Sequence, residues 1–67
     1  MAESLTENVE QKLYTASDYV GAANLLTTIV SELVQQGDLS SATTAMKSVN
    51  LLLEKANQIV QQMSSLV

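Results

Sequence analysis

The chain has 67 residues, a net charge of −4, and neither cysteine nor histidine. A chain this short buries only about 60% of the surface that its unfolded form exposes. Without cysteine or histidine it cannot add a disulfide or an ordinary zinc site. Self-association or binding to a partner therefore remains as the means of stabilising it. Three lysines and no arginine argue against nucleic-acid binding, and no apolar stretch approaches the about twenty residues of a membrane span.

The surface is predicted to be polar but weakly charged. Charged residues make up 15% of the chain, well below the roughly 25% of an average protein, and 24 residues are Ser, Thr, Asn or Gln. A surface of this kind tolerates contact with another protein. The acidic N-terminal residues lead directly into an amphipathic pattern, unlike a signal peptide, so we expect a cytoplasmic protein.

The side chains that catalysis needs are mostly missing. Histidine and cysteine are absent, and Lys12, Lys47 and Lys55 are predicted to lie beside or outside the apolar face. Gly21 and Gly37 stand alone and do not form a phosphate-binding loop. We therefore expect no enzymatic activity, no cofactor, no metal site and no small-molecule substrate.

A first helix is predicted over about residues 5–36. Ser4 and Glu7 have the spacing of a capping box, which marks a helix start. The apolar residues recur seven apart in three rows: Val9, Ala16, Ala23 and Val30; Tyr19, Leu26 and Leu33; and Leu13, Val20 and Val34, the last interrupted by Thr27. A kink between Ser17 and Gly21 is left open, and Gly21 with the two alanines after it forms a thin patch that a neighbouring helix could approach closely.

A turn is predicted at residues 37–38, followed by a second helix over about 39–65. Gly37 suits the left-handed position after a helix, and Asp38 is a preferred N-cap for the next one. So short a connection makes the two helices antiparallel neighbours. The predicted seam of the second helix contains Ala42, Met46, Val49, Leu53, Ala56, Val60, Met63 and Val67, and a second apolar row beside it contains Ala45, Leu52, Ile59 and Leu66.

These patterns predict an all-α protein whose residues 1–67 form one helical hairpin, and we expect two hairpins to pair into a four-helix bundle because each apolar face is wider than one partner helix can cover. The function expected is a non-enzymatic protein–protein interaction module, a small homodimeric adaptor or regulator. The residues expected at its interface are Tyr19, Leu26, Leu33, Val49, Leu52, Leu53, Ile59, Val60 and Met63. Tyr14 and Leu51 fall outside the apolar rows.

Two alternatives stay open. With its length, its acidity, Gly37 at the turn and the stretch Leu51-Leu52-Leu53-Glu54, the chain resembles the small co-chaperones that hold needle subunits in type III secretion. That resemblance implies a co-chaperone that covers a hydrophobic helix of its partner, and it assigns no functional residues. The other alternative is a structural subunit whose hairpins polymerise through their Ser, Thr and Gln surfaces. The partner expected is thus a second copy of the chain, another helical protein, or both.

Overall fold

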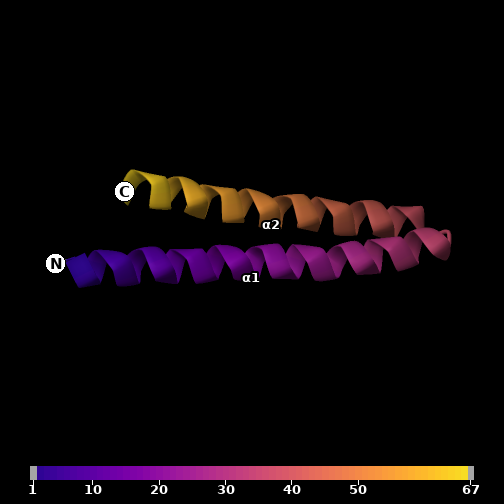
Figure 1. Ribbon diagram of the computed structural model, residues 1–67. Helices are drawn as coiled ribbons and strands as arrows, with labels where there is room; N and C mark the ends of the chain where they lie inside the picture. Colours follow the sequence, from indigo (N-terminus) through magenta and orange to yellow (C-terminus); the bar gives the residue numbers. More distant parts are fainter. Residues whose placement is uncertain (1, 67) are drawn as a thin grey trace.

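The protein is a hairpin of two long helices. The computed structural model describes the backbone of residues 2–66 and the side chains of residues 5–66. Helix α1 spans Ala2–Gln35 and helix α2 spans Leu39–Leu66. The two helices lie side by side along their length and run antiparallel, so that α1 begins at the same end of the molecule at which α2 ends (Figure 1). The predicted antiparallel two-helix hairpin is confirmed.

The turn between the helices is closed by backbone hydrogen bonds. Gly37 has a φ angle of +81°. Its N–H donates to the carbonyl oxygen of Val34 at 3.0 Å, and the N–H of Asp38 donates to that of Leu33 at 2.9 Å, which is the Schellman pattern of a helix C-terminus. Asp38 then caps α2, because its Oδ1 accepts a hydrogen bond of 3.1 Å from the N–H of Ser41. Gly37 and Asp38 therefore have the conformations that the sequence predicts.

Helix α1 is longer at its start than predicted and has no break. It begins at Ala2, three residues before the predicted start, and it continues through residues 17–21, where a kink was left open. The Ser4 side chain, and with it the capping box, lies outside the described residues. Gly21 faces open space, since a Cβ added to it would meet no atom within 4 Å. Gly21 itself therefore makes no close approach to α2, whereas Ala22 is half-buried and Ala23 is buried.

The core is a narrow seam between α1 and α2. We define the seam as the buried and half-buried residues that alternate three and four apart: Val9, Lys12, Ala16, Tyr19, Ala23, Leu26, Val30 and Leu33 in α1, and Ala42, Ala45, Val49, Leu52, Ala56, Ile59, Met63 and Leu66 in α2. Only five of the described residues are buried, and apart from Val49 all of them are alanines. No large described side chain is fully buried. The hairpin alone thus buries little apolar surface.

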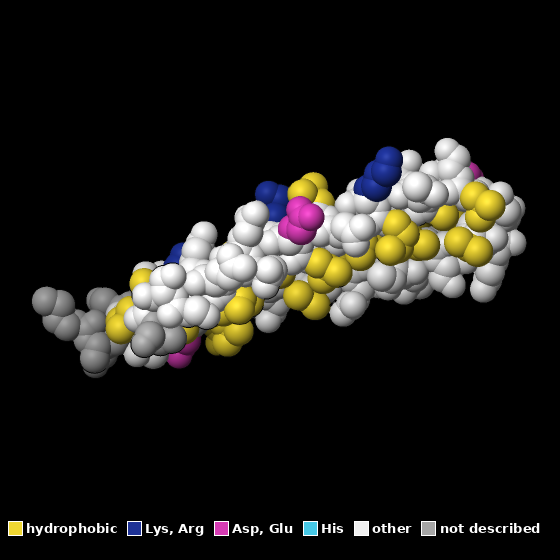
Figure 2. All heavy atoms as spheres, turned by 90° about the horizontal axis from the view of Figure 1, so that it is seen from above, with side chains coloured by type: hydrophobic (Ala, Val, Ile, Leu, Met, Phe, Trp, Pro, Cys, Tyr) yellow, Lys and Arg dark blue, Asp and Glu magenta, His cyan; other side chains and the backbone are white. Residues whose placement is uncertain are grey.

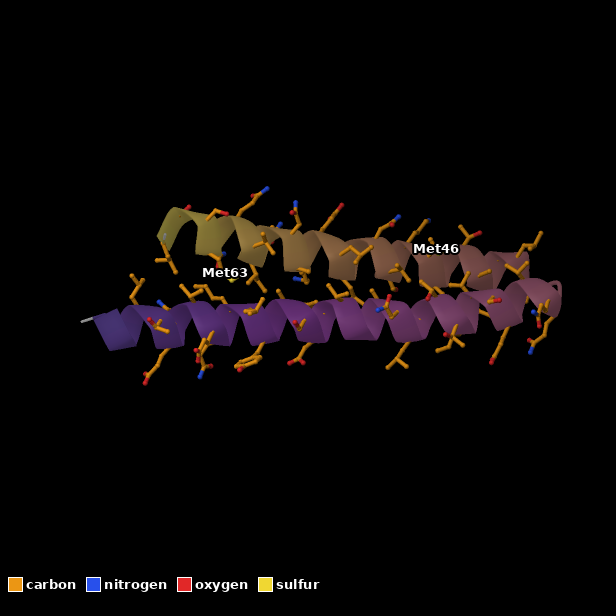
Figure 3. The ribbon with its side chains drawn as sticks, in the orientation of Figure 1. Met46 and Met63 are labelled. Carbon is orange, nitrogen blue, oxygen red and sulfur yellow. The ribbon has the colours of Figure 1, made fainter. Side chains whose placement is uncertain are left out.

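The seam of α2 differs from the predicted one by one row. Met46, Leu53 and Val60 were predicted to face α1, but they are 39–45% exposed. The row that begins at Ala45 faces α1 in their place. Met63 lies in the seam as predicted, and its side chain points from α2 toward α1 (Figure 3). The reason is geometric: the central row of α2 has an apolar row on each side, and one partner helix covers only one of them. The eighth predicted seam residue, Val67, lies outside the described residues.

Lys12 occupies a seam position, although it was predicted beside or outside the apolar face. It is half-buried, and its Nζ donates a hydrogen bond of 3.2 Å to Oε1 of Gln62. A lysine can hold this position because its aliphatic stem packs on apolar neighbours while its ammonium group reaches the edge. The Lys12–Gln62 contact joins the two helices near the open end of the hairpin.

Candidate interaction surface

One side of the hairpin carries a row of exposed apolar side chains from each helix. We call these residues the apolar face: Leu13, Val20 and Val34 of α1, and Leu39, Met46, Leu53 and Val60 of α2. Their side chains are between 39% and 63% exposed. Successive members of each row are seven residues apart except where Thr27 interrupts α1, so each row keeps to one side of its helix. Hydrophobic side chains form a band along one side of the molecule (Figure 2).

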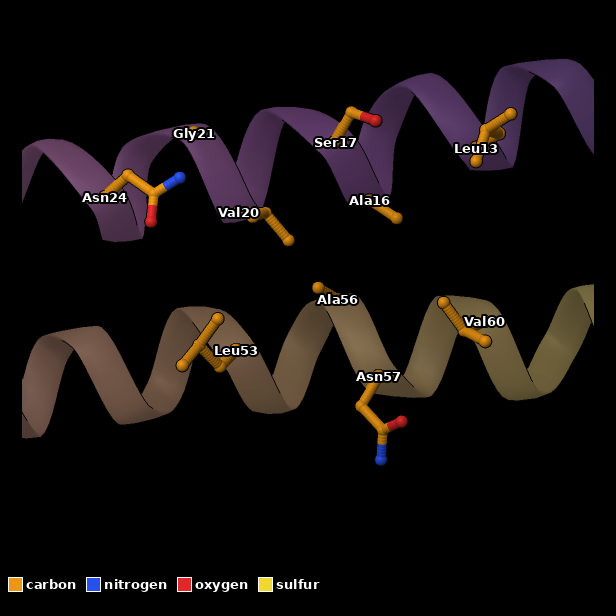
Figure 4. A pocket seen from close by; sticks show the side chains of 10 residues that line it. All are labelled: Leu13, Ala16, Ser17, Val20, Gly21, Asn24, Leu53, Ala56, Asn57 and Val60. Carbon is orange, nitrogen blue, oxygen red and sulfur yellow. The ribbon is translucent and has the colours of Figure 1, made fainter.

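Two hollows, each lined by residues of both rows, show that the rows lie on the same side of the seam. The larger, of about 480 Å³, is lined by Leu13 and Val20 from α1 and by Leu53 and Val60 from α2. Val20, Leu53 and Val60 point toward the opposite helix across this hollow (Figure 4). The other hollow, of about 360 Å³, lies near the turn and is lined by residues that include Val34, Leu39 and Met46.

Small side chains keep the larger hollow open. Ala16 of α1 and Ala56 of α2 line it and are each only 5% exposed, so they form its floor. The surrounding leucine and valine side chains stand higher than these alanines. The surface is therefore a groove with apolar walls into which side chains of another helix can insert, as ridges pack into grooves between helices.

The opposite side of the seam is more polar than the apolar face. A hollow on that side is lined by Asn8, Gln11, Lys12 and Thr15, with Ile59 as its apolar member. By helical spacing the neighbouring row of α2 consists of polar residues: Ser41, Ser48, Lys55 and Gln62. The corresponding row of α1 also contains Ala22 and the exposed Ile29, so this side carries fewer apolar side chains than the apolar face but is not free of them.

Charged residues avoid the margins of the apolar face. We call the two rows that border the apolar face on the side away from the seam the rim rows. By helical spacing they contain Glu10, Ser17, Asn24 and Ser31 in α1, and Thr43, Asn50, Asn57 and Ser64 in α2. Seven of these eight residues are uncharged, and the exception, Glu10, lies near the open end. Protein–protein interfaces are depleted of charged residues at their centre and have polar rims, so an apolar face bordered by polar, mostly uncharged residues is compatible with an interface.

Six of the described hydroxyl groups donate to the backbone of their own helix. Thr15 Oγ1 donates to the carbonyl oxygen of Gln11 at 2.9 Å, and Thr43 Oγ1 donates to that of Leu39 at 2.8 Å. The same bond to a carbonyl three or four residues earlier is made by Thr27, Thr44, Ser64 and Ser65. These hydroxyl protons are already used within a helix, so the groups offer little to a neighbouring molecule.

The nine residues predicted at an interface fall into two groups. Leu53 and Val60 lie on the apolar face and are exposed. The other seven lie in the seam, where they face the second helix of the same chain: Tyr19, Leu26, Leu33, Val49, Leu52, Ile59 and Met63. As contacts with a second chain, all nine stay predictions. Sequence reasoning missed Leu13, Val20, Val34, Leu39 and Met46 as interface candidates, and the signal that could have found them is the uncharged rim rows beside them.

Several large apolar side chains are exposed away from the apolar face. Tyr14 is 65% exposed and Leu51 is 53% exposed, in line with their positions outside the apolar rows. Leu25, at 72%, is exposed on α1 and was not singled out by the sequence pattern. Isolated exposed leucines are common on protein surfaces, and these residues form no continuous row.

Comparisons with known proteins give this chain no relatives: no family model, no curated protein and no solved structure matches it. Neither helix, over the residues that the structure describes, has a stretch long and apolar enough to cross a membrane. Among the same residues, no three carboxylates lie close enough together to hold a metal ion. The physical character of the apolar face is therefore what argues for a function.

Proposed function

We propose that the protein is a non-enzymatic interaction module, a small homodimeric adaptor or regulator, in which two hairpins bury their apolar faces against each other as a four-helix bundle. The observation that carries this proposal is an apolar face along both helices, with margins that are uncharged except at Glu10, beside a seam in which only Val49 and four alanines are buried. Burying half-exposed Leu, Val and Met side chains stabilises a protein by about 25 cal/mol for each Å² removed from water. A hairpin with so thin a core gains much from that burial.

The size of the face fits a stable dimer. The Cα atoms of the hairpin extend over 54 × 15 × 10 Å. The projected area of its broad side is therefore about 800 Å², which is of the same order as the roughly 800 Å² of accessible surface that each partner buries in an interface of standard size. A two-fold axis lying in this side would bring the same seven residues of both copies together, as the common two-fold symmetric interface requires.

The charge of the face also fits a second copy. The chain as a whole is acidic, with a net charge of −4, so two copies repel each other through most of their surfaces. The apolar face carries no charge, and its rim rows carry only Glu10. Pairing through this side thus brings the fewest like charges together, since juxtaposed like charges oppose association.

A helix of another protein is the alternative occupant of the same face. A co-chaperone would lay its groove over an amphipathic helix whose apolar side chains enter the two hollows. The remaining interpretation, polymerisation through hydroxyl and amide surfaces, gains no support, because many of the hydroxyls bond to their own helices. The cytoplasmic location stays a prediction.

Adjacent leucines provide the test. Leu53 is on the apolar face, whereas Leu51 is exposed on the outside of α2. In a dimer, Leu53→Asp places an unpaired carboxylate in the interface, which costs several kcal/mol, while Leu51→Asp leaves it in water. Sedimentation equilibrium at micromolar concentration should give a monomer for Leu53→Asp and a dimer for Leu51→Asp. Circular dichroism should show whether Leu53→Asp keeps its helices.

A milder pair of substitutions tests the same interface if the Leu53→Asp variant unfolds. Leu53→Gln and Leu51→Gln add no charge, and Leu53→Gln should weaken dimerisation whereas Leu51→Gln should not. Equal dimer dissociation constants for the two glutamine variants would exclude the apolar face as the dimer interface.

A further inference from the structure

We infer that the two hairpins pair with both turns at the same end of the bundle, so that α1 of each copy packs against α2 of the other. This inference rests on the proposed function, since it assigns the orientation of a second copy on the apolar face. It predicts contacts that no other orientation makes.

Two orientations are compatible with a two-fold axis lying in the apolar face. If the axis runs parallel to the helices, both turns lie at the same end and α1 stacks on α2 of the copy. If the axis runs across the helices, the turns lie at opposite ends, so α1 stacks on α1 and α2 on α2. Stacked helices are antiparallel in both cases, so the helix dipoles do not favour either orientation.

The charges of the two helices differ in sign. Over the described side chains, α1 carries four carboxylates, Glu7, Glu10, Asp18 and Glu32, against the single ammonium group of Lys12, so its net charge is −3. In α2 two lysines stand against Glu54, so its net charge is +1. Stacking α1 on α1 brings the two strongly acidic helices together as nearest neighbours. Stacking α1 on α2 instead gives each acidic helix a neighbour that is not acidic, with a net charge of +1 within α2 and of zero when the Asp38 cap is included, and it places the two α1 helices on the diagonal of the bundle.

The apolar rows fit the same-end orientation. With the axis parallel to the helices, each level of the hairpin meets the same level of the copy. The larger hollow brings Leu13, Val20, Leu53 and Val60 into one segment of the hairpin, so in the dimer eight leucine and valine side chains would surround the alanine floors of both copies. Residues that line the smaller hollow near the turn would likewise meet their own counterparts.

The rim rows identify positions that report the orientation. Ser17 of α1 and Asn57 of α2 line the same hollow, and both are exposed. They belong to the outer rows of different helices, so same-end pairing places Ser17 of one copy beside Asn57 of the other. Opposite-end pairing with full overlap places Ser17 beside Asn24 of the copy, because helix α1 then meets itself in reverse.

Disulfide trapping tests the inference directly, because the chain has no cysteine of its own. The variants Ser17→Cys, Asn57→Cys and Asn24→Cys are purified singly, mixed in pairs under reducing conditions, and then oxidised at low ionic strength, where charge effects are least screened. Covalent dimer is measured on non-reducing gels. The Ser17→Cys and Asn57→Cys mixture should yield severalfold more covalent dimer than either variant alone or than the Ser17→Cys and Asn24→Cys mixture.

Sedimentation equilibrium of the same unoxidised proteins separates the outcomes. A dimer that links preferentially through Ser17→Cys and Asn24→Cys, or that links through neither mixture, would overturn the orientation and leave the homodimer standing. A monomer at all concentrations tested would instead remove the proposed function, and the inferred orientation with it.

Discussion

Glycine has opposite effects on stability at the two positions where it occurs. Gly37 has a φ angle of +81°, a conformation that side-chain-bearing residues rarely adopt. Gly21 lies inside α1 at an exposed position, where it only weakens the helix. Within the hairpin, an added Cβ would meet no other atom within 4 Å at either position, so the backbone conformation decides the direction of the effect there.

Alanine substitutions at these two glycines should therefore shift stability in opposite directions. Gly37→Ala should lower the free energy of unfolding by about 1 kcal/mol, because alanine is strained at positive φ. Gly21→Ala should raise it by up to about 1 kcal/mol. Thermal unfolding followed by circular dichroism at one fixed protein concentration measures both. A rise in melting temperature for Gly37→Ala would argue against the turn and for one continuous helix.

The cap of α2 makes stability depend on pH. Hydrogen bonds from the side chain and the backbone N–H of Ser41 hold the pKa of Asp38 below its ordinary value of 3.8. Because the folded pKa is the lower one, the ionised carboxylate stabilises the folded state fully above the ordinary value, and this contribution is lost as the pH falls through the folded pKa.

The variant Asp38→Asn isolates that contribution, since asparagine also caps helices but does not titrate. The difference in stability between the original protein and Asp38→Asn should be constant near neutral pH and should change, to the disadvantage of the original protein, as the pH falls below 3.8. Urea unfolding at a series of pH values measures it. A difference that stays constant down to pH 2 would show that the Asp38 cap does not titrate differently in the folded state.

At the scale of the helices, three consecutive leucines lie in three different environments. Leu51 is exposed on the outside of α2, Leu52 is half-buried in the seam, and Leu53 is on the apolar face. Successive residues of a helix are separated by about 100° around its axis, which accounts for the three environments. The same substitution at each position therefore probes a different part of the structure.

Leu52→Asp should unfold the hairpin, because the carboxylate would enter the seam between α1 and α2 without a partner, at a cost of several kcal/mol. Leu51→Asp is its matched control and should keep the helicity and melting temperature of the original protein. Circular dichroism distinguishes them. If Leu51→Asp and Leu52→Asp melted at the same temperature, the seam defined here would be wrong.

The helices and the turn could be predicted from sequence, but the seam of α2 could not. Gly37 and Asp38 determine the turn through local backbone chemistry, and rows seven residues apart reveal a helix from the sequence alone. The seam depends on the partner helix: Ala45 and Met46 stand on either side of the Ala42 row, and both begin apolar rows. Hydrophobicity cannot tell which of these rows α1 covers, whereas three-dimensional packing does.

Lys12 is a second residue whose place in the seam could not be predicted from the sequence, in this case because it is charged. A lysine reads as a surface residue in sequence, yet at this position its stem lies in the seam and its ammonium group reaches Gln62, fifty residues later in the chain. The residues around Lys12 in the sequence do not indicate a hydrogen-bond partner that is fifty residues away. The contact appears only once α2 is folded back on α1.

For the molecule as a whole, we propose that one hairpin is half of a four-helix bundle and is stabilised by a second copy. Among its described residues only Val49 and four alanines are buried, while seven larger apolar residues remain exposed on one face. A protein stabilised by its own second copy has a melting temperature that rises with protein concentration, because association favours only the folded state. A self-sufficient hairpin shows no such dependence.

Sedimentation equilibrium of the unaltered protein over a hundredfold range of micromolar concentrations tests this claim most directly. We predict one species of about twice the chain mass of 7.2 kDa, unchanged in size as the concentration rises, with helical circular dichroism throughout. A helical monomer of 7.2 kDa that melts cooperatively at a temperature independent of its concentration would contradict the account.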